Sequence, residues 1–378
     1  MAGKAPDENV VQFSRLGYHS GVLPDHRIVA MAEEGHIRAD EAIEDNQYQP
    51  ASLDLRLGST AYRIRASFLP GAAASVDSRV AEFSLHKFSI EQGAILETGC
   101  VYLIPLIESL ALPDDLHAAA NPKSSTGRLD VFTRLICDSA TTFDTIPVGY
   151  TGRLYAEVAP RTFSIVVRRG SRLNQIRLRR GGAALADDDL MRLHRKAPIT
   201  GSDPMIRNGL GVSVSLAPSM GRLIGFRAKR HAELLDVDAV DRYDPADFWD
   251  ALTASRNSQL ILDPDQFYIL ASKNAVAVPP THAAEMAAFD PLMGEYRVHY
   301  AGFFDPGFGR LGSDKTSRAV LEVRSREVPF MLTDGQVIAR LIYEQLTDLP
   351  RHLYGHDRGS HYQDQGLKLG KQFKPYVP

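Results

Sequence analysis

The sequence predicts a mainly β protein, with an all-β barrel or sandwich fold present in two tandem copies and a few short helices. Strand-length apolar runs follow one another between Pro and Gly residues, and no long helix intervenes. A set of landmarks from the first half also recurs in the second half. The chain of 378 residues is long for a single core, so two domains are expected.

A short helix is expected to follow a loose amino-terminal arm over residues 1–20. Pro24 and Asp25 mark its start, and Gly35 follows its end. Its apolar face is formed by Ile28, Met31 and Ala32. The helix would pack at the front of the first β domain.

Alternation marks the first strand, within residues 47–58. Asp54 and Arg56 alternate with Leu53, Leu55 and Leu57. This period of two predicts a half-buried strand. Further strands are predicted at 61–65, 101–107, 129–135, 152–158, 163–167, 172–178 and 211–216.

Residues 181–208 interrupt the β pattern with Gly, Pro and an acidic run, which indicates a connector with one helical turn around Leu190–His194. We therefore predict a first domain over 1–190, a linker over 191–208 and a second domain over 209–378. An acidic, helix-like insert near 236–254 carries Trp249, and it fits either an oligomer contact or a surface decoration.

The internal repeat is read from matched tetrapeptides. Val101-Tyr102-Leu103-Ile104 matches Phe267-Tyr268-Ile269-Leu270 at an offset of 166, since 268 − 102 = 166. Later landmarks keep their order: Val148-Gly149-Tyr150 parallels Pro306-Gly307-Phe308, and Tyr155-Ala156-Glu157-Val158 parallels Val320-Leu321-Glu322-Val323. A period this long indicates a duplicated domain.

Composition limits the class of protein. The net charge of -3 argues against a nucleic-acid binder, and no apolar run approaches membrane-spanning length. Two cysteines, Cys100 and Cys137, make a disulfide framework untenable, so a reducing cytoplasm is expected. The basic cluster Arg177–Arg180 is interpreted as a solvated edge strand.

The densest group of potential ligands lies at 121–128, where Lys123 and Arg128 offer charge. Gly127 permits close backbone approach, and the hydroxyl donors are Ser124, Ser125 and Thr126. This set suits a polyphosphate, because a guanidinium can bind two oxygens at once. A polar turn before a strand is the alternative.

These segments resemble the dCTP deaminase / dUTPase family. The resemblance is carried by 49–58, 108–113 and 123–128 in the first half, by 301–308 and 320–322 in the second, and by the tail from Tyr354 to Gly366. It implies two tandem dUTPase-like β-barrel domains of the β-clip or jelly-roll type. It also implies sites between neighbouring barrels, a homo-oligomer with intersubunit sites, and dCTP or dUTP as the bound nucleotide.

The two copies have lost different pieces. The first retains the phosphate loop and Gln175, whereas the second has Glu295 where the first has Arg128. The second retains Asp305, whose place in the first is taken by Pro147. We infer one site in which the first copy binds the triphosphate and the second binds the nucleoside; independent decay of each copy is the alternative.

The resemblance places the catalytic carboxylate on Glu322 or Glu157. A single buried carboxylate with a raised pKa can move the protons of hydrolytic deamination. We favour Glu322, because it shares a hairpin with Asp305, while Glu157 is either a second base or a relic paired with an arginine. The resemblance further assigns substrate contacts to Val320 and Leu321, and to the tail residues Tyr354, His361 and Gln365.

The expected activity is that of a hydrolase that converts dCTP to dUTP and ammonia, acting on a cyclic amidine C–N bond. The alternatives are a dUTP diphosphatase, a bifunctional enzyme and a non-catalytic nucleotide-binding protein. No zinc is expected, because His231-Ala232-Glu233 is not accompanied by a C-x-x-C segment. Mg²⁺ is expected on the triphosphate, with Asp54 either holding it through water or only pairing with a nearby arginine and stabilising the strand.

Overall fold

The computed structural model describes residues 19–217, 222–288, 296–298, 302–309, 311, 317–325, 327–355 and 362–377. It is mainly β with a few short helices, as the sequence predicts. The helices are α1 (Asp25–Glu33), α2 (Val76–Phe83), α3 (Ser124–Gly127), α4 (Asp187–Lys196), α5 (Pro245–Phe248) and the 3-10 turn η2 (Asp45–Gln47). Within the described part of the chain, none of the helices is long and apolar enough to cross a membrane.

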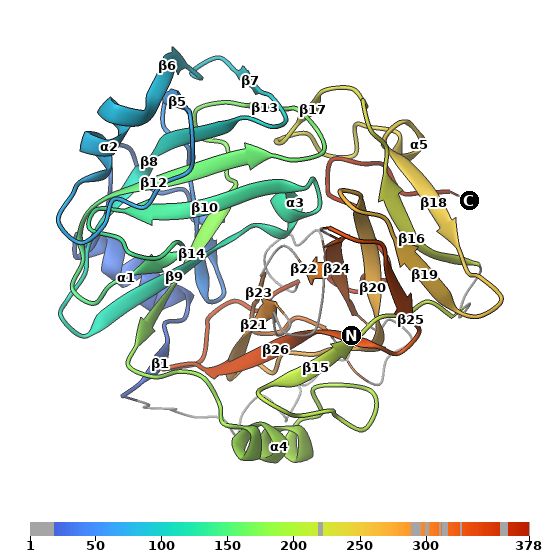
Figure 1. The fold of residues 1–378 in the computed structure, drawn as a ribbon. Helices are drawn as coiled ribbons and strands as arrows, with labels where there is room; N and C mark the ends of the chain where they lie inside the picture. Colours follow the sequence, from blue (N-terminus) through green and yellow to red (C-terminus); the bar gives the residue numbers. More distant parts are fainter. Residues whose placement is uncertain are drawn as a thin grey trace, which may run out of the picture.

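Two groups of sheets lie side by side in Figure 1, one from each half of the chain. The first half contributes β1 (Gly21–Val22), β2 (Ile37–Ala39), β3 (Tyr48–Gln49), β4 (Ser52–Leu55), β5 (Thr60–Ile64), β6 (Ser84–Ser89), β7 (Ala94–Leu96), β8 (Val101–Ala111), β9 (Leu116–Pro122), β10 (Val131–Cys137), β11 (Thr145–Ile146), β12 (Thr151–Pro160), β13 (Ile165–Val167) and β14 (Asn174–Arg180). The second half contributes β15 (Leu210–Ser213), β16 (Leu223–Ala228), β17 (Leu235–Asp236), β18 (Trp249–Thr253), β19 (Gln259–Leu262), β20 (Phe267–Ala275), β21 (His282–Ala288), β22 (Tyr296–Val298), β23 (Phe303–Phe304), β24 (Arg318–Ser325), β25 (Phe330–Thr333) and β26 (Val337–Gln345).

The strand orders of the two halves repeat. One sheet has the order β11-β9-β14-β4 and its counterpart has β23-β21-β26-β15. The other has β10-β12-β8-β5-β6, matched by β22-β24-β20-β16-β18. The likeness extends to atoms: the hydroxyl of Tyr102 accepts a hydrogen bond from the backbone N–H of Glu97 (3.1 Å), and that of Tyr268 accepts one from Asp263 (2.9 Å).

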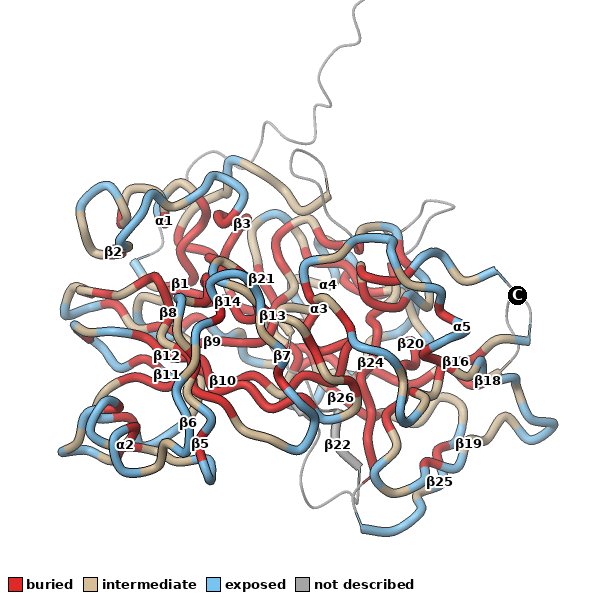
Figure 2. The backbone as a smooth tube through the Cα atoms, turned by 90° about the horizontal axis from the view of Figure 1, so that it is seen from above, coloured by how far each residue is buried: buried red, intermediate tan, exposed pale blue. Residues whose placement is uncertain are grey.

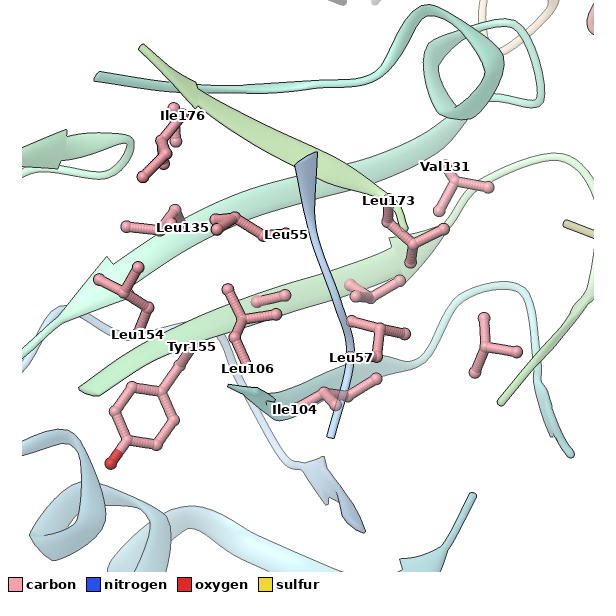
Figure 3. Packing of buried hydrophobic residues seen from close by; sticks show 14 of the residues in the cluster. Leu55, Leu57, Ile104, Leu106, Val131, Leu135, Leu154, Tyr155, Leu173 and Ile176 are labelled. Atoms are coloured by element: carbon pink, nitrogen blue, oxygen red, sulfur yellow. The ribbon is translucent and has the colours of Figure 1, made fainter. Parts of the chain in front are cut away.

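Leucines and isoleucines of facing strands fill the core of the first half. Figure 3 shows Leu55, Ile104, Leu135 and Ile176 pointing into one space between the strands. Strand alternation explains this packing, because every second side chain of a strand faces the same side. Figure 2 shows that the buried segments form a continuous interior through both halves.

The strand at 52–55 is more buried than its alternation indicates. Leu53 and Leu55 are fully buried, but Asp54 and Arg56 are only 2% and 4% exposed. The expectation of a half-buried strand was therefore wrong. The polar side is covered because Arg56 binds the buried carboxylate of Glu108 at 2.7 Å, while Asp54 pairs with Lys123.

The basic cluster Arg177–Arg180 does not lie on a solvated edge. Its strand, β14, is paired with β9 on one side, and on the other with β4 up to Ile176 and with β1 at Arg179 and Arg180; Arg177 is completely buried. Carboxylates of the second half explain the burial, because Arg177 and Arg179 both bind Glu344. The interpretation as an edge strand was therefore wrong.

The insert that carries Trp249 forms part of the interior. Its helical content is the four-residue α5, and Trp249 is 3% exposed. The indole packs against Phe163 of the first half (ring centroids 5.5 Å apart), Phe267 of the second half (6.0 Å) and Phe373 of the tail (5.8 Å). This aromatic cluster ties the two halves and the tail together.

Some elements were not anticipated from the sequence. The helical turn in the connector is instead the ten-residue α4, and α2 and β9 were not predicted. α1 starts at Asp25, and its face with Ile28 and Met31 is buried, as predicted.

Candidate active site

A cavity lies where the two halves meet. It is lined by side chains from the first half, from β23 and the residue that follows it, from β24 and from the tail. The expectation that Asp305 and Glu322 share a hairpin was wrong, because β23 pairs with β21 whereas β24 pairs with β20 and β22. These include Lys123, Ser124, Arg128, Phe303, Asp305, Val320, Glu322, Tyr354, Tyr362 and Gln365. Residues that the sequence assigned to different ends of a ligand are thus brought together within one chain.

A second, wider cavity adjoins the first and shares several lining residues with it, among them Lys123, Ser124 and Asp305. Its further lining residues are more polar and include Asp54, Ser125, Arg172, Gln175, Asp238 and Lys371. The two cavities form a narrow inner end and a broad, charged outer end. Such a shape fits a small ring attached to a highly charged group.

A one-turn helix at the end of β9 sets the phosphate loop. The carbonyl of Lys123 accepts hydrogen bonds from the N–H groups of Thr126 (2.8 Å) and Gly127 (3.0 Å), which closes α3. The turn leaves Lys123 and Ser124 facing the cavities, while Thr126 and Gly127 are buried and line neither cavity. The loop therefore offers fewer side chains to a ligand than its sequence contains.

Arg128 lies deep in the inner cavity, beside Glu322. Its Nε is 3.8 Å from Glu322 Oε1, and the side chain is 3% exposed. The rest of the guanidinium is held by the tail: Nη1 donates to the carbonyl of Lys368 (3.0 Å) and Nη2 donates to Gln365 Oε1 (3.0 Å). The ring of Tyr362 lies 3.9 Å from its central carbon, a cation–π contact.

The carboxyl group of Glu322 has the properties of an acid–base group. Burial raises its pKa to about 7, and the positive charge of Arg128 opposes this shift. Strand alternation directs Val320 and Glu322 into the cavity. Leu321 points the other way, is fully buried in the core of the second half and lines neither cavity, so its assignment as a substrate contact is not supported by its side chain.

Asp305 follows β23 and is buried against a residue of the first half. Arg177 Nη2 donates to Asp305 Oδ1 at 3.2 Å. Burial raises the pKa of Asp305, and the nearby Arg177 partly offsets that effect. The first-half counterpart of β23 is β11, since β11 pairs with β9 and β23 pairs with β21. Pro147 follows β11 and therefore occupies the place that Asp305 has after β23.

Asp54 and Lys123 form an ion pair at the outer cavity. The other carboxylate oxygen of Asp54, Oδ1, is buried and has no hydrogen-bond partner in the described ranges. Gln175 lies across from it on β14 and accepts a hydrogen bond from Ser52 (3.4 Å). The sequence did not identify Lys123 as the cation paired with Asp54.

Glu157 lies at the place in β12 that Glu322 occupies in β24, since it pairs with Leu103 as Glu322 pairs with Ile269. Its carboxylate accepts a hydrogen bond from Arg134 Nε at 3.0 Å, and this guanidinium is stacked on Phe143 at 3.6 Å. Glu157 lines neither cavity. This geometry agrees with the alternative that Glu157 is a relic paired with an arginine, rather than a second base.

Two residues that the sequence singled out, His361 and Glu295, lie outside the described residues. Sequence reasoning in turn missed Tyr362, Phe303 and Lys371, which line the cavities. Tyr362 lies inside the tail segment that carried the resemblance, so its aromatic character was the available signal. Phe303 likewise lies inside the segment 301–308 that carried the resemblance, whereas Lys371 carries no signal without the fold.

The fold and the site define a class of protein. A mainly β chain in which hydroxyls and cations adjoin a buried carboxyl group of near-neutral pKa is suited to bind a phosphorylated ligand and to transfer protons on it.

The comparisons with known proteins give the family. The amino-terminal domain model of 2'-deoxycytidine 5'-triphosphate deaminase matches residues 19–182, and the carboxy-terminal domain model matches residues 186–373. The chain belongs to the dCTP deaminase family.

Individual relatives agree. The crystal structure of 2'-deoxycytidine 5'-triphosphate deaminase from Agrobacterium tumefaciens is 53% identical, with a TM-score of 0.84 over 87% of this chain and 100% of that chain. The "dCTP deaminase" of Haloarcula marismortui is 30% identical over 41% of this chain and 78% of its own length. The "dCTP deaminase, dUMP-forming" of Methanothermobacter thermautotrophicus is 31% identical over 36% of this chain and 68% of its own length.

Proposed function

We propose that this chain hydrolyses dCTP to dUTP and ammonia, acting on the amidine C–N bond of the cytosine ring, with Glu322 as the proton-transfer group. The observation that carries the proposal is the carboxyl group of Glu322, which is held in the inner cavity with a pKa of about 7. A group that titrates near neutral pH can both accept and release a proton under ordinary conditions.

In this proposal the ionised Glu322 accepts a proton from water as the oxygen attacks C4 of cytosine. The proton passes to the ring, and the amino group leaves as ammonia once it has gained a further proton. The attacking water supplies the oxygen at C4 of uracil, the hydrogen on ring N3 and the third hydrogen of ammonia, so no other reactant is required. Arg128, 3.8 Å from the carboxylate, favours its ionised form at the start of the cycle.

The remaining ligand contacts follow the two ends of the cavity. Lys123, Ser124 and Ser125 would bind the triphosphate at the outer end, together with Gln175, Arg172 and Lys371. Asp305 and Val320 would bind the deoxyribose and base at the inner end. Arg128, which sequence reasoning gave to the phosphates, is proposed here to act on Glu322 and on the tail, because its donors already face both.

Magnesium is proposed as a companion of the triphosphate. The unpartnered Oδ1 of Asp54 and the carboxylate of Asp238 line the outer cavity, and oxygen ligands suit Mg²⁺. When bound, the ion would neutralise phosphate charge. We also propose that the chain forms a tandem pair of dUTPase-like barrels divided at the 191–208 linker, and the repeated strand orders support this division. We further propose that the chains associate into an oligomer.

The test is to incubate the purified protein with dCTP and Mg²⁺ and to measure ammonia, dUTP, dUMP and pyrophosphate. Ammonia and dUTP in equal amounts, without pyrophosphate, are expected. Absence of ammonia at any pH between 6 and 9 would refute the proposal, and binding of dCTP without turnover would identify a nucleotide-binding protein instead.

A second activity is favoured by the names of several relatives, which are "dUMP-forming". Cleavage of dUTP would then follow deamination in the same cavity. Release of pyrophosphate in step with ammonia would support this bifunctional reading, and pyrophosphate from dUTP alone would support a diphosphatase.

A further inference from the structure

Arg177 is a completely buried charged side chain, as is Glu108, and it lies outside the lining of the two cavities. It belongs to β14 of the first half, and its relative exposure is 0%. Burial of a guanidinium is costly unless its donors are satisfied, so its partners indicate its role.

The partners of Arg177 are all in the second half. Nη1 donates to the carbonyl of Ala284 (2.9 Å) and to Glu344 Oε2 (3.1 Å). Nη2 donates to Asp305 Oδ1 (3.2 Å) and more weakly to the carbonyl of Phe304 (3.4 Å). The guanidinium also lies 4.1 Å from the ring centroid of Phe303. One side chain therefore contacts three consecutive residues, 303–305, of β23 and its carboxyl end.

We propose that Arg177 is a positioning residue that fixes the Asp305 carboxylate and the Phe303 ring at the inner end of the cavity, so that the first half controls the geometry of nucleoside binding. Arg177 does not line either cavity and would act only through these two residues. The inference deepens the proposed function and rests on it.

The electrostatic surroundings of Asp305 support this role. The charged groups that face it are Arg177 from β14, Asp54 from β4 and Lys123 from the end of β9. Burial and Asp54 both raise the pKa of Asp305, whereas Arg177 and Lys123 lower it. Loss of the Arg177 charge would raise this pKa further, and a protonated Asp305 would be a weaker hydrogen-bond acceptor for a sugar hydroxyl than the carboxylate is.

Arg179 provides a matched control. It lies two residues further along the same strand and binds the same Glu344 at 2.6 Å, but its other partner is Glu285 and it has no bond to Asp305. A loss caused by general damage to the interface between the halves should therefore appear in variants of both arginines.

The experiment compares Arg177→Met, Arg177→Lys, Arg179→Met, Asp305→Ala and the double variant Arg177→Met/Asp305→Ala. Circular dichroism and melting temperature establish which variants are folded. Steady-state kinetics with dCTP and calorimetric binding of dUTP are then measured between pH 6 and 9.

For Arg177→Met we expect a KM for dCTP and a Kd for dUTP at least about tenfold higher than those of the wild type at pH 7, with part of the loss recovered as the pH rises. Arg179→Met should remain within about threefold and show no such recovery. Arg177→Lys should recover part of the affinity. In the double variant, the arginine substitution should add almost nothing to the loss from Asp305→Ala, because both act through one carboxylate.

Equal losses in the two methionine variants, or an additive loss in the double variant, would overturn the inference. If Arg177→Met does not fold, Arg177→Lys and its combination with Asp305→Ala carry the same additivity test. An inactive wild type would instead refute the proposed function, so the two failures are distinguishable.

Discussion

Arg128 Nε and Glu322 Oε1 lie 3.8 Å apart, although the two residues come from opposite halves of the chain. Both side chains are almost completely buried, at 3% and 7% exposed. In such surroundings the interaction between the two charges is stronger than at the surface. The pair therefore sets both the protonation of Glu322 and the tail contacts that enclose it.

Removal of the Glu322 carboxylate is expected to abolish deamination. Glu322→Gln keeps the size of the side chain but cannot accept a proton, so kcat should fall by about 10²–10⁴-fold or more. Binding of dUTP should change much less. Ammonia release in a coupled assay gives kcat, and calorimetry gives the affinity.

Glu157→Gln is the matched control, because Glu157 occupies the equivalent strand position in the first half. Its kcat should remain within a few fold of the wild-type value. Its stability should fall, since Arg134 would lose a buried partner. A loss of kcat in Glu157→Gln comparable to that in Glu322→Gln would show that the base is assigned to the wrong half.

The pH dependence of the reaction should report the Arg128–Glu322 pair. The attacking water needs an ionised Glu322, so kcat should fall as the pH drops below about 7, the value to which burial raises the pKa of Glu322. Because Arg128 lowers this pKa, Arg128→Met should move the acid limb to higher pH and reduce the rate at pH 7. A profile of kcat against pH for both proteins tests this. An acid limb that moves to lower pH would contradict the assignment.

The raised pKa of Glu322 also predicts that Glu322→Gln, although inactive, is more stable than the wild type above pH 7. Glu322 has a pKa raised from 4.5 to about 7 in the folded state, so its ionisation above pH 7 destabilises the fold by an amount of the order of 3 kcal/mol. Below pH 4.5 the carboxyl group is protonated in both states and the cost vanishes. Glu322→Gln should therefore raise the free energy of unfolding at pH 8 and have little effect near pH 4.5. Urea unfolding at the two pH values measures the difference; a variant less stable at pH 8 would contradict it.

Trp249 should report the integrity of the contact between the halves. Trp249→Ala removes a buried ring that packs against Phe163, Phe267 and Phe373, and it should cost about 3–5 kcal/mol of unfolding free energy. Trp249→Phe should cost less, because the indole N–H makes no hydrogen bond in the part of the chain that the structure describes. Thermal unfolding measures both. Met331→Ala, at a 55% exposed position of the second half, is the control and should be nearly neutral.

Trp249 is also the single tryptophan of the chain, so wild-type fluorescence follows this cluster without labelling. A single transition that coincides with the loss of circular dichroism is expected if the halves unfold together. An earlier fluorescence transition would instead indicate that the contact opens before the sheets melt.

The sequence identified the elements whose signals are local. Alternating leucines located β4, Pro24 and Asp25 located the start of α1, and the repeated tyrosines Tyr102 and Tyr268 aligned the halves. It also named Lys123, Arg128, Asp305 and Glu322, which the structure brings to one cavity. These residues could be named because the resemblance is carried by short segments, 123–128, 301–308 and 320–322, each continuous in the sequence.

The sequence did not reveal partners that are distant along the chain. A strand with Arg177 and Arg179 resembles a solvated edge until Glu344 is placed opposite it. Likewise, Trp249 has the pattern of a surface insert until Phe373 returns from the tail. In both cases the burial of a side chain depends on a surface supplied by the other half, which no local pattern encodes.

Because Arg128 and Glu322 belong to one polypeptide, the activity should depend little on protein concentration. Arg128 and Glu322 meet through intramolecular packing, so their effective concentration does not depend on how many chains are present. Specific activity should thus stay constant on dilution to nanomolar levels, whereas a pocket assembled from separate chains would fall apart by mass action. Because one reading frame encodes both halves, Arg128 and Glu322 are always produced in equal numbers.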